Sequence, residues 1–200
     1  MLEFGAARYE FRAFGANLDS FAQVLSGSAE EEQVEFSSDT YLVSRLTLDA
    51  NLKLRDNTLE LKKLEARRGI LERWNVIAKH DFPVSSEFLK HQVWPELGVD
   101  MDTPDASELS FDGIAGTVRP NPSLDMAELH KERTRYWFAS AMAEYVRIGI
   151  DDTLVQSVAV ESASAEAVEA LIARFGLSQY RNQSYPAFLQ EYLFARKPAA

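Results

Sequence analysis

Charged and apolar residues alternate with a period of two in several short segments, and this pattern restricts the fold more than any other feature of the sequence. In one segment, Leu52 and Leu54 alternate with Lys53 and Arg55. Because successive side chains of a β-strand point to opposite faces, the alternation predicts strands with one polar and one apolar face. Strands are predicted in this way at Arg8–Phe14, Tyr41–Arg45, Asn51–Arg55, Leu59–Leu64, Arg133–Phe138, Glu144–Ile150 and Val155–Glu161.

Turn and helix signals complete a mixed α+β pattern. Asp56 and Asn57 separate two predicted strands and tolerate positive φ, so they predict a tight hairpin turn between antiparallel strands. The clearest helix is predicted over Ala165–Phe175, with Ser164 as its N-cap and Gly176 just beyond its end. Shorter helices are predicted at Leu18–Leu25, Glu87–Trp94 and Tyr185–Phe194.

The polar faces of these strands carry like charges two residues apart, as in Lys53 with Arg55 and Arg133 with Arg135. Antiparallel sheets often expose one face, so such a face can simply be solvated. In a closed barrel the apolar face can instead pack outward while the polar face lines the interior. Since like charges on one face repel each other, we expect an anion or facing carboxylates to compensate them. Carboxylates on the predicted strands are Glu10, Glu60, Glu144 and Glu161.

Length and composition favour one globular domain over the whole chain, residues 1–200. The chain has 200 residues, of which 46% are hydrophobic, and this is enough for a sizeable core. The segment 99–123 holds three prolines and two glycines, so we expect an irregular insertion there. Both halves of the chain beside it are strand-rich, which places the insertion within a single domain.

The charge balance excludes some classes of partner. The formal net charge is −10, which argues against general nucleic-acid binding but leaves room for a small anion in a local basic pocket. The chain contains no cysteine, which excludes a disulfide framework and a thiol nucleophile. Neither a signal peptide nor a stretch of membrane-spanning length is visible, so we expect a cytoplasmic protein without membrane contact.

In the order and spacing of short motifs over nearly the whole chain, the sequence resembles the CYTH superfamily of triphosphate tunnel metalloenzymes, in a bacterial branch. The final stretch is the most specific, whereas each other motif is weak alone. The motifs are YEFRAFG, NLKLRDNTLELKKLEA, ERTRYWF, and EYVRIGIDDTLVQSVAVES followed by a helix and FGLSQYRNQSYPAFL.

This resemblance implies an eight-stranded antiparallel tunnel, closed as a barrel, with peripheral helices and a small polyanionic ligand inside. It implies a triphosphate or polyphosphate-like ligand held by basic residues, and Mg²⁺ or Mn²⁺ held by carboxylates. It is also compatible with a homodimer. By motif position, the phosphate-binding residues would be Lys53, Arg55, Lys62, Arg133 and Arg135, and the metal-binding residues would be Glu161, Glu10 and Glu144.

The chain also departs from the family pattern. The family's first strand reads Glu-x-Glu-x-Lys, whereas this chain has Arg12 and Phe14 after Glu10. A second family pair, Glu-x-Glu, is here Ala159 and Glu161. Fewer carboxylates weaken a hard-cation site. Arg12 would then either add a phosphate contact or pair with Glu10.

These observations leave three functions open. The first is a metal-dependent triphosphate phosphohydrolase, in which tunnel cations offset the charge on the transferring phosphoryl group. The second is a binding or regulatory module that holds a polyanion or nucleotide with a degenerate metal site and no turnover. The third is a structural partner whose tunnel is filled by its own side chains.

Overall fold

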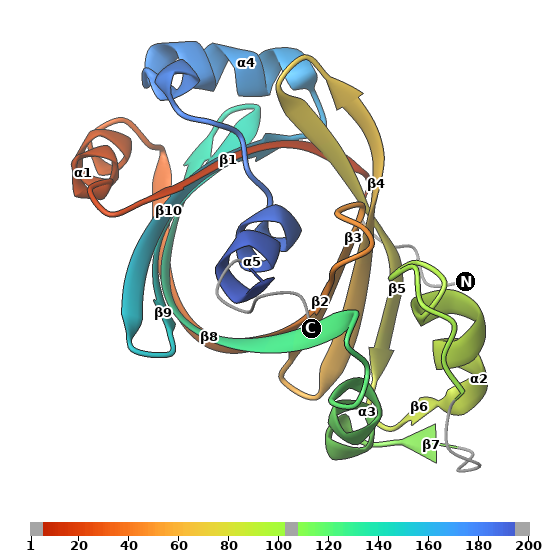
Figure 1. Cartoon of the computed structure of the whole chain (residues 1–200). Coiled ribbons are helices and arrows are strands. Elements are labelled where there is room, and N and C mark those ends of the chain that lie inside the picture. The colour runs from red at the N-terminus through yellow and green to blue at the C-terminus, as the bar shows by residue number, and fades with distance from the viewer. Residues whose placement is uncertain (1–5, 103–107, 195–200) are drawn as a thin grey trace.

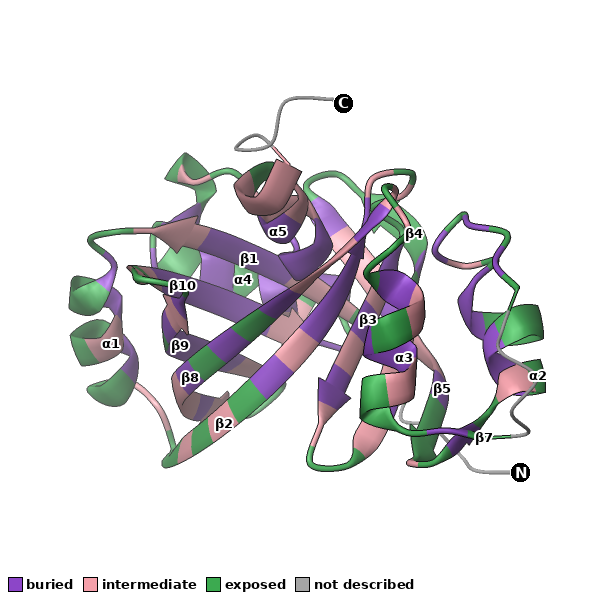
Figure 2. Ribbon diagram, turned by 60° about the horizontal axis from the view of Figure 1, so that its bottom comes forward, coloured by how far each residue is buried: buried purple, intermediate pink, exposed green. Residues whose placement is uncertain are grey.

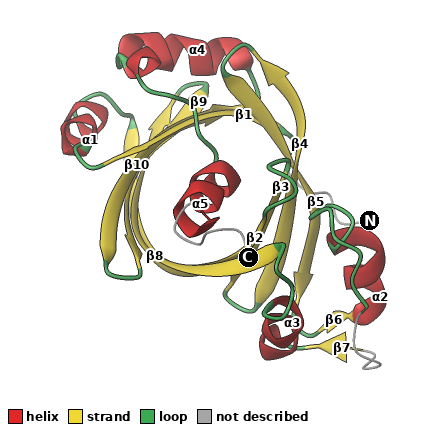
Figure 3. Ribbon diagram, viewed as in Figure 1, coloured by secondary structure: helices red, strands yellow, loops and turns green. Residues whose placement is uncertain are grey.

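Eight antiparallel strands form a closed barrel in a computed structural model that describes residues 6–102 and 108–194 (Figures 1 and 3). Around the barrel the order is β1-β10-β9-β8-β2-β3-β4-β5, and β1 closes it by pairing with both β10 and β5. The predicted α+β tunnel fold is confirmed. The barrel strands are β1 (Arg8–Gly15), β2 (Glu31–Ser44), β3 (Ala50–Arg55), β4 (Thr58–Arg68), β5 (Leu71–Asp81), β8 (Leu124–Phe138), β9 (Ala141–Ile150) and β10 (Thr153–Ser162).

Short helices and one small two-stranded sheet accompany the barrel. The helices are α1 (Asp19–Ser26), α2 (Ser86–Phe88) continued by a π-helical turn (Leu89–Val93), α3 (Phe111–Val118), α4 (Ala165–Arg174), a 3₁₀ turn (Leu177–Gln179) and α5 (Tyr185–Phe194); the sheet pairs β6 (Val84–Ser85) with β7 (Glu108–Leu109). The segment 99–123, expected as an insertion, contains β7 and α3, and its residues 103–107 lie outside the described ranges. None of the helices in the described ranges is long and apolar enough to span a membrane.

The turn and the helix caps that the local sequence predicts are observed. Asp56 and Asn57 have φ values of 46° and 64° in the turn between β3 and β4. The Ser164 side chain accepts a hydrogen bond from the backbone N–H of Ala167 at the start of α4, and Gly176 adopts the left-handed conformation after the helix. These features depend only on neighbouring residues, and they set the strand and helix ends on which the barrel is built.

The apolar faces of the barrel strands point outward where the inward faces are charged. Phe11 on β1 and Val168 on α4 belong to one buried cluster on the outside of the barrel. Leu52 on β3 and Ile114 on α3 belong to another. Of the two possibilities for the polar faces, the closed barrel with a polar interior is therefore the one observed.

Helix α5 is not peripheral, because it covers one end of the barrel (Figure 2) and lies within the ring of strands when viewed down the barrel (Figure 1). Tyr185 and Leu189 on α5 share a buried cluster with Leu129 on β8 and with Val146 and Ile148 on β9. The interior is consequently apolar at the end that α5 fills and charged at the other. Inside the barrel, the charged cavity therefore lies next to the apolar end that α5 fills.

The packing of α5 inside the end of the barrel gives the first prediction. Leu189 is fully buried, so Leu189→Ala should cost about 2–5 kcal/mol. In a chain of this length that lowers the melting temperature by roughly 4–20 °C, measurable by circular dichroism. The control is Glu191→Ala on the exposed side of α5, which should shift the melting temperature much less. An equal melting temperature for Leu189→Ala and the parent protein would contradict this packing of α5.

Candidate functional site

The open half of the barrel contains a charged cavity of about 440 Å³, and basic side chains outnumber acidic ones in its wall. All nine residues predicted as phosphate or metal ligands line this one cavity, although their roles stay predictions. The basic wall residues are Arg8, Arg12, Lys53, Arg55, Lys62, Lys131, Arg133 and Arg135, and the acidic ones are Glu10, Glu60, Glu144 and Glu161.

Side-chain exposure on β8 shows the direction of the cavity. The exposed fraction rises from 3% for Lys131 to 13% for Arg133 and 26% for Arg135. These residues alternate along the strand, so they form a ladder with rungs roughly 7 Å apart. Lys131 lies at the floor beside α5, and Arg135 lies toward the open end.

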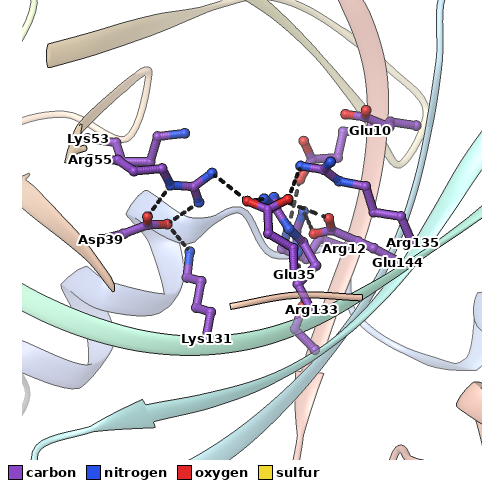
Figure 4. Close-up of polar contacts among 12 residues, drawn as sticks. Glu10, Arg12, Glu35, Asp39, Lys53, Arg55, Lys131, Arg133, Arg135 and Glu144 are labelled. Carbon is purple, nitrogen blue, oxygen red and sulfur yellow. Dashed lines mark hydrogen bonds and ion pairs between the residues drawn. The ribbon is translucent and has the colours of Figure 1, made fainter. Parts of the chain in front are cut away.

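Three arginines converge on one carboxylate, that of Glu35 on β2 (Figure 4). Glu35 Oε1 lies 2.8 Å from Arg133 Nη2 and 3.5 Å from Arg55 Nη1, and Glu35 Oε2 lies 3.1 Å from Arg135 Nη2. Burial opposes the charge on Glu35, but the three guanidinium groups outweigh it and lower its pKa. Three guanidinium groups thus share the Glu35 carboxylate, while Arg55 also pairs with Asp39 and Arg133 Nη1 lies 3.8 Å from Glu144 Oε2.

Asp39 on β2 organises the floor of the cavity. It is fully buried, and it accepts two hydrogen bonds from Arg55 and one of 2.9 Å from Lys131 Nζ. Lys131 also donates to Tyr41 Oη at 2.7 Å and lies 3.9 Å from the ring centre of Tyr185. Burial lowers the pKa of Lys131 to about 7, although Asp39 opposes that shift. The positive charge of Lys131 is therefore costly to bury, and Asp39 is the anion that offsets it.

Arg12 lies against the same wall and is held by three strands. Its Nε donates to Glu10 Oε1 at 2.8 Å, its Nη1 to Ser157 Oγ at 3.1 Å, and its Nη2 pairs with Glu144 Oε1 at 2.7 Å. Burial opposes its charge, but Glu10 and Glu144 outweigh that and raise the pKa of Arg12. The expected pairing of Arg12 with Glu10 is observed, and a phosphate contact of Arg12 stays a prediction.

Solved structures share this architecture, whereas no family model and no curated protein matches the sequence. A conserved hypothetical protein from Pyrococcus furiosus aligns over 90% of this chain and 98% of its own, with a TM-score of 0.53 and 15% identity. A protein from Pyrococcus horikoshii OT3 aligns over 92% and 99%, with a TM-score of 0.51 and 12% identity. A Hippeastrum adenylyl cyclase-type protein, described as having a dominant triphosphatase activity, aligns over 91% and 93%, with a TM-score of 0.52 and 11% identity.

The chain has the CYTH, or triphosphate-tunnel, fold. The resemblance seen in the motifs is thereby confirmed at the level of the fold. At these identities the likeness does not extend to the chemistry of the tunnel, which has to be judged from the residues of this chain.

The CYTH resemblance implies a divalent metal, and the carboxylates of this tunnel do not fit one. Within residues 6–102 and 108–194, no group of three His, Cys, Asp or Glu side chains is placed to hold a metal ion. Glu10 and Glu144 are both engaged by Arg12, and Glu161 Oε1 lies 3.1 Å from Arg8 Nη1. The hard oxygen ligands that Mg²⁺ or Mn²⁺ would need are therefore already paired with guanidinium groups.

Sequence reasoning missed four residues of the tunnel: Glu35, Asp39, Lys131 and Tyr185. Lys131 is two residues before Arg133 and shares its face, so the alternation could have been extended to it. The strand was expected to begin at Arg133 because residues 124–130 are apolar or mixed on both faces, and the structure shows that α5 packs against the inner one. Glu35 and Asp39 lie in a largely polar stretch of β2 without contrast between faces.

Glu161 gives a pH-dependent prediction. It lies directly across from Glu10 in the β1–β10 register, and burial followed by the charges of Glu10 and Glu144 raises its pKa. A raised folded-state pKa means that stability is full below the unfolded value, about 4.3, and is lost as pH rises through the folded value. Glu161→Gln should therefore raise the melting temperature at pH 7, and the gain should vanish in acid.

The size of that gain follows from the cost of two like charges that lie opposite each other in a sheet, about 0.2–1 kcal/mol of stability. For a chain of this length, removing that cost raises the melting temperature by up to roughly 4 °C. The matched control is Glu166→Gln at the start of α4, where hydrogen bonds lower the pKa to about 2. That variant should lower the melting temperature at pH 7. If Glu161→Gln also lowers it, the Glu161 carboxylate is stabilising and the assignment is wrong.

Proposed function

We propose that the tunnel binds a small polyanion of the triphosphate or polyphosphate type. The observation that carries this proposal is the convergence of Arg55, Arg133 and Arg135 on the single carboxylate of Glu35. Guanidinium groups match phosphate oxygens with paired N–H donors, and a cluster with excess positive charge in a partly enclosed cavity favours an anion.

One donor in the cluster is left without a partner in the described part of the chain. Nε of Arg133 is buried and has no hydrogen-bond partner among the described residues. A buried donor without a partner costs free energy, which a ligand oxygen can recover. Lys53 pairs with Glu60 at 3.1 Å on the neighbouring wall, and Lys62 also lines the cavity, so further cations lie within reach of a bound chain.

The shape of the cavity limits the size of the ligand. About 440 Å³ is a usual volume for a small-molecule site. Because α5 closes the far end, a ligand enters from the end where Arg8 and Arg135 lie and stops at the floor made by Lys131 and Tyr185. Such a pocket suits a short phosphate chain or the terminal phosphates of a larger molecule.

Binding without turnover is the proposal that the carboxylates favour. A metal-dependent phosphohydrolase with Mg²⁺ or Mn²⁺ would be consistent with the activity described for the Hippeastrum protein. In this chain, however, Glu10 and Glu144 are committed to Arg12. Phosphate release from tripolyphosphate in Mg²⁺ or Mn²⁺, abolished by Glu161→Gln, would establish hydrolysis instead.

Calorimetric titration with tripolyphosphate tests the binding function. We expect one ligand per chain, and Arg133→Ala should weaken binding roughly 10- to 150-fold, since a hydrogen bond to a charged group contributes about 1.5–3 kcal/mol. The control is Arg147→Ala, because Arg147 is half-exposed and pairs with Glu132 away from the cavity. Absence of binding by the parent protein, or an equal loss in both variants, would contradict the proposal.

A substitution of Glu35 should change tripolyphosphate affinity in the opposite direction. The Glu35 carboxylate occupies the arginine cluster, so a phosphate group must share or displace it. Glu35→Gln should therefore tighten tripolyphosphate binding roughly threefold to tenfold, as expected for about 1 kcal/mol. Glu132→Gln on the outer face of β8 is the matched control and should change nothing. Weaker binding by Glu35→Gln would mean that Glu35 is needed to hold the arginines in place.

A further inference from the structure

We propose that the guanidinium group of Arg12 takes the place of a divalent cation in this tunnel, so that the ligand is the metal-free form of the polyanion. The identity of the ligand rests on the proposed function, whereas the role of Arg12 can be tested on the protein alone.

The geometry around Arg12 is that of a cation shared by facing carboxylates. Strand β10 lies between β1 and β9, and Arg12 joins all three through Glu10 on β1, Ser157 on β10 and Glu144 on β9. Each guanidinium nitrogen thus has a partner on a different strand. All three nitrogens, Nε, Nη1 and Nη2, therefore have a partner within the wall.

The positive charge of Arg12 is permanent, although its side chain is buried. The side chains of Arg12 and Glu144 are each 7% exposed, and arginine stays protonated at every pH at which proteins fold. A divalent ion taking up Glu10 and Glu144 would have to break both ion pairs. It would also leave the Arg12 guanidinium buried beside a second cation, which is strongly unfavourable.

The remaining carboxylate does not restore a metal site. Glu161 is paired with Arg8, and Lys62 also lies at this part of the wall. Arg133 approaches the second oxygen of Glu144 at 3.8 Å. Cations of the chain therefore surround all three carboxylates that the resemblance assigned to metal.

A consequence follows for the ligand. Chelation by Mg²⁺ removes two charges from a polyphosphate and occupies oxygens that the arginines would bind. In a tunnel that already carries its own fixed cation, the unchelated polyanion is the better ligand. Excess Mg²⁺ should weaken tripolyphosphate binding on the order of tenfold relative to the same titration in EDTA.

The first test needs no polyanion. The free Mn²⁺ signal in electron paramagnetic resonance, recorded with equal concentrations of Mn²⁺ and protein, should be undiminished by the parent protein. Arg12→Lys, which keeps a cation at this position, should behave in the same way. Arg12→Glu, which adds a carboxylate between Glu10 and Glu144, should deplete the signal. Circular dichroism establishes whether each variant is folded. If Arg12→Glu does not fold, the Mn²⁺ signals recorded with the parent protein and with Arg12→Lys still test the proposal.

Stoichiometric Mn²⁺ binding by the parent protein would overturn the proposal. So would tripolyphosphate binding that is seen only with Mg²⁺ or Mn²⁺ and is lost in EDTA. If tripolyphosphate fails to bind in either buffer, the proposed function fails, while the Mn²⁺ signal still decides the role of Arg12. Tripolyphosphate binding that is seen in EDTA and is weakened by Mg²⁺ supports both the proposed function and the proposed role of Arg12.

Discussion

Like charges brought together on the inside of a closed barrel are the constraint on which the rest of this structure depends. Closure places cations from β1, β3, β4 and β8 in one enclosed space, where their repulsion is weakly screened. Glu35 and Asp39 offset part of that charge from β2, and Glu10 and Glu144 offset Arg12. Compensation is incomplete around Glu35, and in the proposed function this remaining positive charge attracts the anion.

Helix α5 allows this charged space to exist in a stable domain. Filling one end of the barrel with Tyr185, Leu189 and their partners gives the inside an apolar core, so only half of the interior has to accommodate charge. Tyr185 also belongs to the charged half, where its ring contacts Arg12 and Lys131. Stability and the depth of the site are therefore set by the same helix.

The comparison with solved structures separates fold from chemistry. Proteins 11–15% identical to this chain share the barrel over nearly their whole length, because the fold needs only alternation, closure and outward apolar faces. The chemistry of the interior depends on single side chains. In this chain Arg12 pairs with both Glu10 and Glu144, and in our proposal this pairing keeps a divalent cation out of the tunnel.

The sequence by itself determined the strands with one charged face, the Asp56–Asn57 turn, the α4 helix with its Ser164 cap, and the shared face of Lys53 with Arg55 and of Arg133 with Arg135. These follow from residues close in the chain. Tertiary structure alone decided that Glu35 meets Arg133, 98 residues away, that Asp39 and Lys131 form the floor, and that α5 enters the barrel. Those contacts depend on register between distant strands and on which end of the barrel is filled, and local periodicity carries no information about either.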